Sequence, residues 1–126
     1  LRSWLTFTAT TRSGRFAGRA AALRGQLEDA EASIRLARSA GVKIAAGSDF
    51  GGGSPRANHL PWEFQSLVAA GLAPVEALAA VTWRGGELLG ERDAGTIREG
   101  GPASFFLVHG DALSDSGALW RVWRHA

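Results

Sequence analysis

Asp49 is the residue whose type and position are best suited to chemistry. It follows the short, mostly apolar run at residues 42–46 and precedes a glycine-rich segment at residues 50–55. In parallel α/β folds, side chains at the carboxyl ends of strands face the active site, which would place this carboxylate for catalysis. The alternative is an aspartate that caps the following turn, which is common after strands. Position alone leaves both interpretations open.

Few other residues could assist Asp49. The chain has no cysteine, so a bound metal would be held by histidines and carboxylates. His59 lies where the loop after Asp49 meets the next predicted helix and could contact a substrate, although most loop residues are simply exposed. His109 and His125 fall in a later, β-rich segment, and we assign neither a role.

The segment before Asp49 has the pattern of a helix followed by a strand. Apolar residues recur at spacings of three and four over about residues 20–40, which predicts an amphipathic helix. Gly41 suits the position after its last turn. The apolar run follows without a loop, as in the helix-to-strand step of a parallel α/β fold. A further short strand is predicted at residues 4–8.

After Asp49 the pattern changes twice. Three helical pieces are predicted, beginning near Pro61, Pro74 and Glu87. Proline suits the first turn of a helix, which supports the first two starts. From about Asp93 onward, short strands are expected instead, at residues 95–97, 104–108 and 119–123. The sequence therefore predicts a helix-rich part at residues 1–92 and a β-rich module at residues 93–126.

Composition and charge argue for a globular protein that binds neither nucleic acid nor membrane. The 126 residues suffice for about one domain, and 45% are hydrophobic. The 14 basic and 12 acidic residues leave a net charge of only +2, although arginines concentrate before Glu28. Nucleic-acid binding by that basic arm stays a weaker alternative. No bilayer-spanning stretch or signal peptide is evident. The absence of cysteine fits a cytoplasmic location.

Several motifs follow one another in a fixed order over roughly residues 28–126. The main ones are AGVKIAAGSD (residues 40–49), NHLPWE (58–63), LVAAGLAPVEAL (67–78) and GTIREG (95–100). No single motif is decisive, but the ordered series resembles the C-terminal portion of the metal-dependent amidohydrolase superfamily. The similarity is greatest to its imidazolonepropionase-like and Xaa-Pro dipeptidase-like branch.

This resemblance implies a fold, a reaction and a role for Asp49. The fold is α/β, with the last strands and helices of a TIM (β/α)8 barrel at residues 1–92 and part of a small β-sandwich module at residues 93–126. The implied reaction is hydrolysis of a C–N bond in a small-molecule amide, peptide or cyclic amide, with zinc or another divalent ion as cofactor. Asp49 would bind the metal and handle the proton of the metal-bound water.

The chain also departs from the family pattern. The family's other metal ligands, a His-x-His pair, a Lys or Glu and two further histidines, have no counterpart before Asp49. Ser104 stands where the small module usually has an acid. Together with the absence of an initiating Met, this predicts a piece of a longer enzyme that is inactive alone. The alternative is a degenerate, non-catalytic barrel fragment that acts by association, and self-association into a homo-oligomer fits either case.

Overall fold

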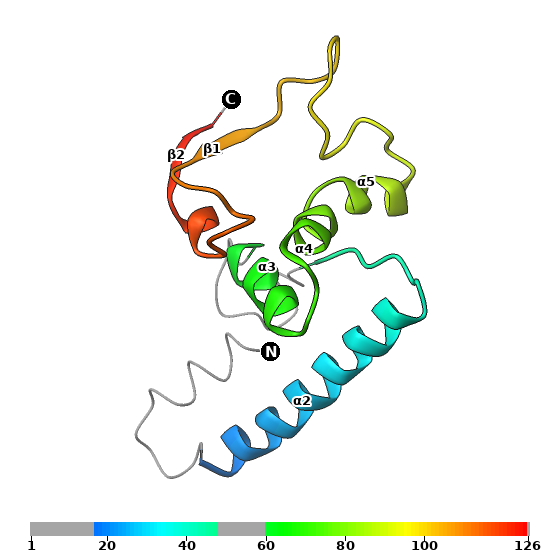
Figure 1. Ribbon diagram of the computed structural model, residues 1–126, viewed down its shortest axis with the longest axis vertical. Helices are drawn as coiled ribbons and strands as arrows, with labels where there is room; N and C mark the ends of the chain where they lie inside the picture. Colours follow the sequence, from blue (N-terminus) through cyan, green and yellow to red (C-terminus); the bar gives the residue numbers. More distant parts are fainter. Residues whose placement is uncertain (1–16, 48–59, 126) are drawn as a thin grey trace.

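The computed structural model describes residues 17–47 and 60–125, with side chains from residue 22 to residue 123 within those ranges (Figure 1). About half of the molecule is helical, and it also contains a two-stranded sheet. The elements in chain order are α2 (Ala17–Ser39), α3 (Leu60–Ala69), α4 (Pro74–Ala80), α5 (Trp83–Leu89), β1 (Phe106–Val108), the 3-10 helix η2 (Ala118–Trp120) and β2 (Val122–His125). None of the described helices combines the length and apolar character needed to cross a membrane.

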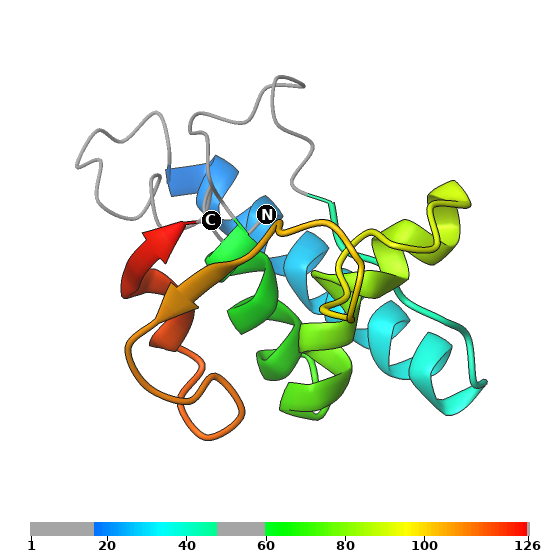
Figure 2. The same ribbon diagram turned by 90° about the horizontal axis from the view of Figure 1, so that it is seen from above.

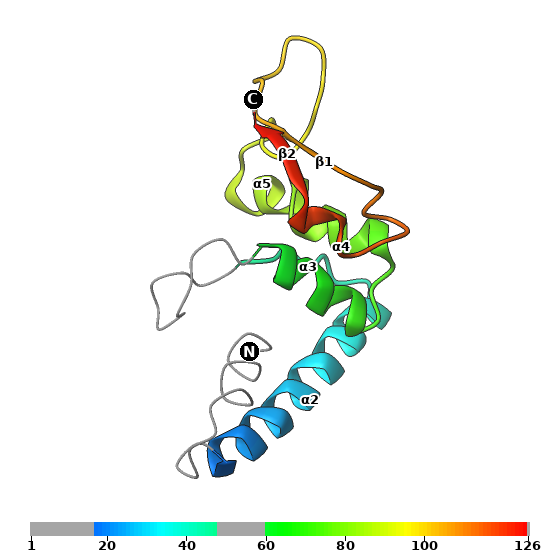
Figure 3. The ribbon, with the colours of Figure 1, turned by 90° about the vertical axis from the view of Figure 1, so that its left-hand side faces the viewer.

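Helices α3 and α4 occupy the middle of the molecule. The β1–β2 hairpin lies on one side of them and α2 on the other (Figures 1 and 2). The C-terminal end of α2 approaches the other helices, whereas its first turns stand apart from them (Figure 3). The packing that holds the molecule together is therefore concentrated between the last turns of α2, the α3–α4 pair and the hairpin.

The predicted amphipathic helix is confirmed as α2, which begins three residues earlier than expected and ends at Ser39. The helix ends because Gly41 adopts a left-handed conformation, with φ of 71°. That turn lets the N–H of Val42 donate to the carbonyl of Ala37 at 2.9 Å. The chain is thereby turned sharply from the helix into the extended segment 42–47.

Segment 42–47 is extended but forms no β-ladder with any described residue. A strand needs a neighbouring strand to satisfy its backbone groups, and the two strands described here pair with each other. The segment instead forms one long-range backbone bond, from the N–H of Ala46 to the carbonyl of Ala80 at 2.8 Å. The segment is half-buried at residues 44–46 and exposed at its two ends, and its place in a parallel sheet stays a prediction.

The three helical pieces after Asp49 are confirmed, with one shifted boundary. Helix α4 begins at Pro74 as predicted, and Gly71 and Gly90 end α3 and α5 with positive φ angles of 107° and 77°. Helix α5 begins at Trp83, four residues before the predicted Glu87. The glycine pair inside it looked like a loop in the sequence, yet Gly86 is buried and a Cβ there would lie 2.7 Å from the carbonyl oxygen of Glu91. Glycine is needed at this position because the backbones of Gly86 and Glu91 lie close together.

One hydrophobic core joins the helices to the hairpin. Its buried members come from α3, α4, the loop between them, and η2: Phe64, Leu67, Leu72, Ala77, Ala80 and Leu119. Half-buried residues of α2, segment 42–47 and β1 pack against this cluster, among them Ile34, Ile44 and Val108. The side chain of Trp120 adds a polar link by donating to Gln65 at 3.1 Å, and its ring meets Trp62 edge-on with centroids 5.4 Å apart.

The β-rich segment contains one hairpin. Strands β1 and β2 are antiparallel, with Phe106 opposite His125, Leu107 opposite Arg124 and Val108 opposite Val122. The predicted strand at residues 95–97 is instead a turn followed by chain that pairs with no strand in the described part of the molecule. Gly95 there has φ of 73°, and a Cβ at this position would lie 2.5 Å from the backbone of Thr82. The close approach to the α4–α5 connection explains why glycine occupies that position.

Candidate functional site

The two residues assigned to the site from sequence, Asp49 and His59, lie outside the described residues. The structure does describe the elements on both sides of them. Segment 42–47 leads toward Asp49, and α3 begins at Leu60, directly after His59. Contacts with the core hold these flanking elements in place.

Segment 42–47 is held at its C-terminal half by the hydrophobic core. The side chains of Ile44 and Ala46 are half-buried and pack against the α3–α4 cluster. The Ala46–Ala80 backbone bond joins the same stretch to the end of α4. At that end, the Thr82 hydroxyl donates to the carbonyl of Leu78 at 2.6 Å, which satisfies one of the last helical carbonyls. The backbone that enters the Asp49 region is therefore fixed from two sides.

The described residues do not themselves supply a metal centre. Within them, no three His, Cys, Asp or Glu side chains gather closely enough to hold an ion. A protein zinc site needs three or more such ligands, so these residues alone do not fit one. His109 is exposed, and its ring lies 5.9 Å from that of Trp123, centroid to centroid. The backbone of His125 belongs to β2. We assign neither histidine a role.

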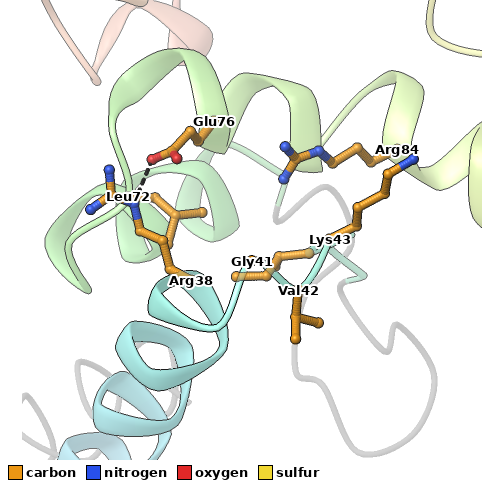
Figure 4. Close-up of a pocket in the computed structure, with 8 residues that line it drawn as sticks. Arg38, Gly41, Val42, Lys43, Leu72, Glu76 and Arg84 are labelled. Atoms are coloured by element: carbon orange, nitrogen blue, oxygen red, sulfur yellow. Dashed lines mark hydrogen bonds and ion pairs between the residues drawn. The ribbon is translucent and has the colours of Figure 1, made fainter.

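A small basic pocket lies where the end of α2, segment 42–47 and the first turns of α4 and α5 meet (Figure 4). Its volume is about 120 Å³, and its charged lining residues are Arg38, Lys43, Glu76 and Arg84. Arg38 Nε donates to a Glu76 carboxylate oxygen at 2.8 Å, and Lys43 reaches Glu87 at 3.3 Å. These ion pairs neutralise Arg38 and Lys43. The pocket therefore acts chiefly as a junction that joins α2 and segment 42–47 to α4 and α5.

Glu76 is the electrostatic centre of this junction. Its carboxylate accepts the N–H of Ala73 at 2.7 Å, which satisfies an otherwise unpaired donor at the start of α4, and it also binds Arg38. These hydrogen bonds, first that from Ala73 and then that from Arg38, hold the pKa of Glu76 below its ordinary value of 4.5. Arg84, whose guanidinium lies on the pocket side of α5, lowers the pKa slightly further.

We expect Glu76→Gln to lower the melting temperature by a few degrees at neutral pH and to have a much smaller effect in acid. A carboxylate whose pKa is depressed by folding stabilises the native state above its unfolded pKa. That contribution is lost as the pH falls below 4.5 through the lower native value. Thermal melts of both proteins across this pH range would measure the difference.

Glu87→Gln is the matched control for that experiment. Glu87 also pairs with a basic residue of the pocket, but both side chains of the pair are at least half exposed. Exposed ion pairs contribute little to stability, so this variant should melt like the wild type at every pH. A Glu76→Gln variant whose melting temperature matched that of Glu87→Gln throughout would contradict the role of Glu76 as a link between α2 and α4.

The sequence analysis did not identify this junction. A partial signal was present, because a glutamate at the third position of a helix often binds back to the residue before the helix. That residue is Ala73 rather than the usual Ser or Thr, which hid the motif. The partner Arg38 lies 38 positions away, so no local pattern could have revealed it.

Comparison with known proteins adds no relative to this description. No protein-family model matches the chain, and searches of curated proteins and of solved structures found no significant match. The function is therefore inferred from the residues of this chain and from the family resemblance of its ordered motifs.

Proposed function

We propose that this chain is the C-terminal portion of a metal-dependent amidohydrolase that cleaves C–N bonds in small amides, peptides or cyclic amides. The ordered motifs from residue 28 onward carry the resemblance. The structural observation that supports it best is the passage from α2 through Gly41 into segment 42–47, which is half-buried at residues 44–46 and leads toward Asp49. A helix, then a mostly apolar run and then a carboxylate is the order of a barrel strand with its catalytic end.

Asp49 is the residue of this chain to which the proposal gives a chemical role. When present, zinc or a similar divalent ion lowers the pKa of a bound water toward ~7. A carboxylate beside that water can accept its proton and return it to the leaving nitrogen. Asp49 is proposed as that carboxylate and as one ligand of the ion, and His59 as a residue that contacts the substrate.

The remaining ligands would have to come from upstream sequence. One carboxylate cannot form a zinc site alone, so we expect the isolated 126-residue chain to show no metal-dependent hydrolysis. The second candidate function is association without catalysis. The observation that favours it is the number of large apolar side chains left exposed, including Leu88, Ile97 and Trp123 at 77%, 84% and 65%.

Reading the source DNA upstream of the codon for Leu1 would test the proposed function. A (β/α)8 enzyme needs roughly 250 residues or more, so we expect a continuous frame extending well upstream. That frame should encode a His-x-His pair, a Lys or Glu in a middle strand and two further strand-end histidines. A stop codon followed by a start site close to Leu1 would leave Asp49 without a metal site and would favour the non-catalytic alternative.

A further inference from the structure

Arg84 is the basic residue of the small pocket that has no bonded partner within the described part of the chain. Its guanidinium enters the pocket from α5, on the opposite side of Glu76 from Arg38 (Figure 4). Among the described residues it forms neither a hydrogen bond nor an ion pair, and it acts on Glu76 only through its charge. Arg84 is half-buried, and a guanidinium carries five N–H donors. Donors that are partly withdrawn from water normally bind an acceptor, so this side chain can take one from outside the chain.

The charge of the pocket favours a negatively charged ligand. Its charged lining consists of three bases and one acid: Arg38, Lys43, Arg84 and Glu76. The Glu76 carboxylate is already bound by Arg38 and by the N–H of Ala73, which reduces its repulsion of an incoming anion. Lys43 pairs with Glu87, but both side chains are at least half exposed. Exposed ion pairs contribute little to stability, so Lys43 can exchange this partner for a bound anion.

The size of the pocket and the shape of its donors fit a small oxyanion. The volume is about 120 Å³, well below the roughly 300–1,000 Å³ of sites that take drug-sized ligands. Arg84 presents a planar fork of donors that matches two oxygens of a phosphate, and Lys43 adds a compact charge that also suits phosphate. Chloride offers no such pair of acceptor atoms. The lining therefore suits a tetrahedral oxyanion better than a halide.

We propose that this pocket binds an oxyanion of the phosphate type, held by Arg84 and Lys43. The bound ion supplies acceptors to the Arg84 guanidinium and adds a link between α5 and segment 42–47. The oxygens can belong to free inorganic phosphate or to the phosphate group of an ester whose remainder lies outside the pocket. Neither Asp49 nor His59 takes part, so the site is independent of the proposed hydrolase function.

Isothermal titration calorimetry of the full chain with inorganic phosphate tests the site, with chloride holding the ionic strength constant. We expect saturable binding of one phosphate per chain, with a Kd in the millimolar range or tighter. Arg84→Gln should weaken this binding about tenfold or more. Arg92→Gln is the matched control, because Arg92 is an exposed arginine just beyond α5 and does not line the pocket. Both variants lose the same charge, so a difference between them separates a specific site from general electrostatic attraction.

Glu87→Gln provides a result that a folding defect cannot imitate. The substitution releases Lys43 and removes a negative charge beside it, so phosphate should bind severalfold more tightly than to the wild type. Titration with glycerol phosphate distinguishes the two sources of the oxyanion. Tighter binding than that of inorganic phosphate would identify an ester, and equal or weaker binding the free ion.

Three outcomes would overturn the proposal. The first is the absence of saturable binding of either phosphate compound in the millimolar range. The second is equal affinity of the Arg84→Gln and Arg92→Gln variants for phosphate. The third is weaker phosphate binding by Glu87→Gln than by the wild type, because it would mean that Lys43 does not contact the ion.

Discussion

Replacing Phe64 by alanine is expected to remove about 3–5 kcal/mol from the free energy of unfolding. Phe64 is fully buried on α3 and is the largest side chain with no exposure among the described residues. Two of its five buried neighbours in the core are alanines, whose short side chains cannot move in to fill the cavity. Natural domains are stable by only about 5–15 kcal/mol, so this loss would approach the whole stability of a marginal one.

Urea denaturation followed by circular dichroism would measure this loss. Phe64→Leu should cost less, because it removes fewer atoms from the same site. Leu88→Ala should change the unfolding free energy by no more than about 0.5 kcal/mol, since Leu88 is 77% exposed. A Phe64→Ala midpoint equal to that of Leu88→Ala would mean that α3 does not form the centre of the core.

The helices were predictable because their signals are local. Apolar spacing identified α2, the two prolines marked the starts of α3 and α4, and glycines marked the helix ends. Each of these signals acts within one or two turns, where the chain's own backbone geometry decides the outcome. The same signals failed at Gly86, because the reason for that glycine is a contact with a turn later in the chain.

The extended segments were harder to assign because a strand is defined by its partner. Residues 42–46 and 95–97 have the composition of strands, yet neither pairs with a strand among the described residues. By contrast, Phe106–Val108 and Val122–His125 became strands by pairing with each other across a turn and η2. Sequence pattern gives the tendency to be extended and half-buried, and the available neighbour decides whether a ladder forms.

The candidate site also has a part that local sequence pattern predicts and a part that depends on distant residues. A local pattern singled out Asp49 as an acid that follows an apolar run, and the same pattern also suits an aspartate that caps a turn. The groups around such an acid come from distant parts of a chain, so the sequence next to the acid does not reveal them. The Arg38–Glu76 contact, which local reasoning missed, illustrates how such long-range pairs escape a sequence pattern.

In the longer enzyme that we propose, Asp49→Asn should lower kcat by about 10²–10⁴-fold, the range typical for loss of a group that transfers a proton. Asparagine keeps nearly the same size but cannot accept a proton at neutral pH. It is also a weaker, uncharged ligand, so the metal content of the purified variant should fall together with its activity. Steady-state kinetics and metal analysis of the same preparations would measure both effects.

Asp29→Asn provides the matched control, because Asp29 is an exposed residue of α2 and the same chemical change is made far along the chain from the proposed site. It should leave both turnover and metal content unchanged. Loss of turnover in Asp49→Asn with full metal content would place Asp49 in proton transfer but not in metal binding. Unchanged turnover in Asp49→Asn would remove the residue from the catalytic site. The resemblance would then describe only the fold.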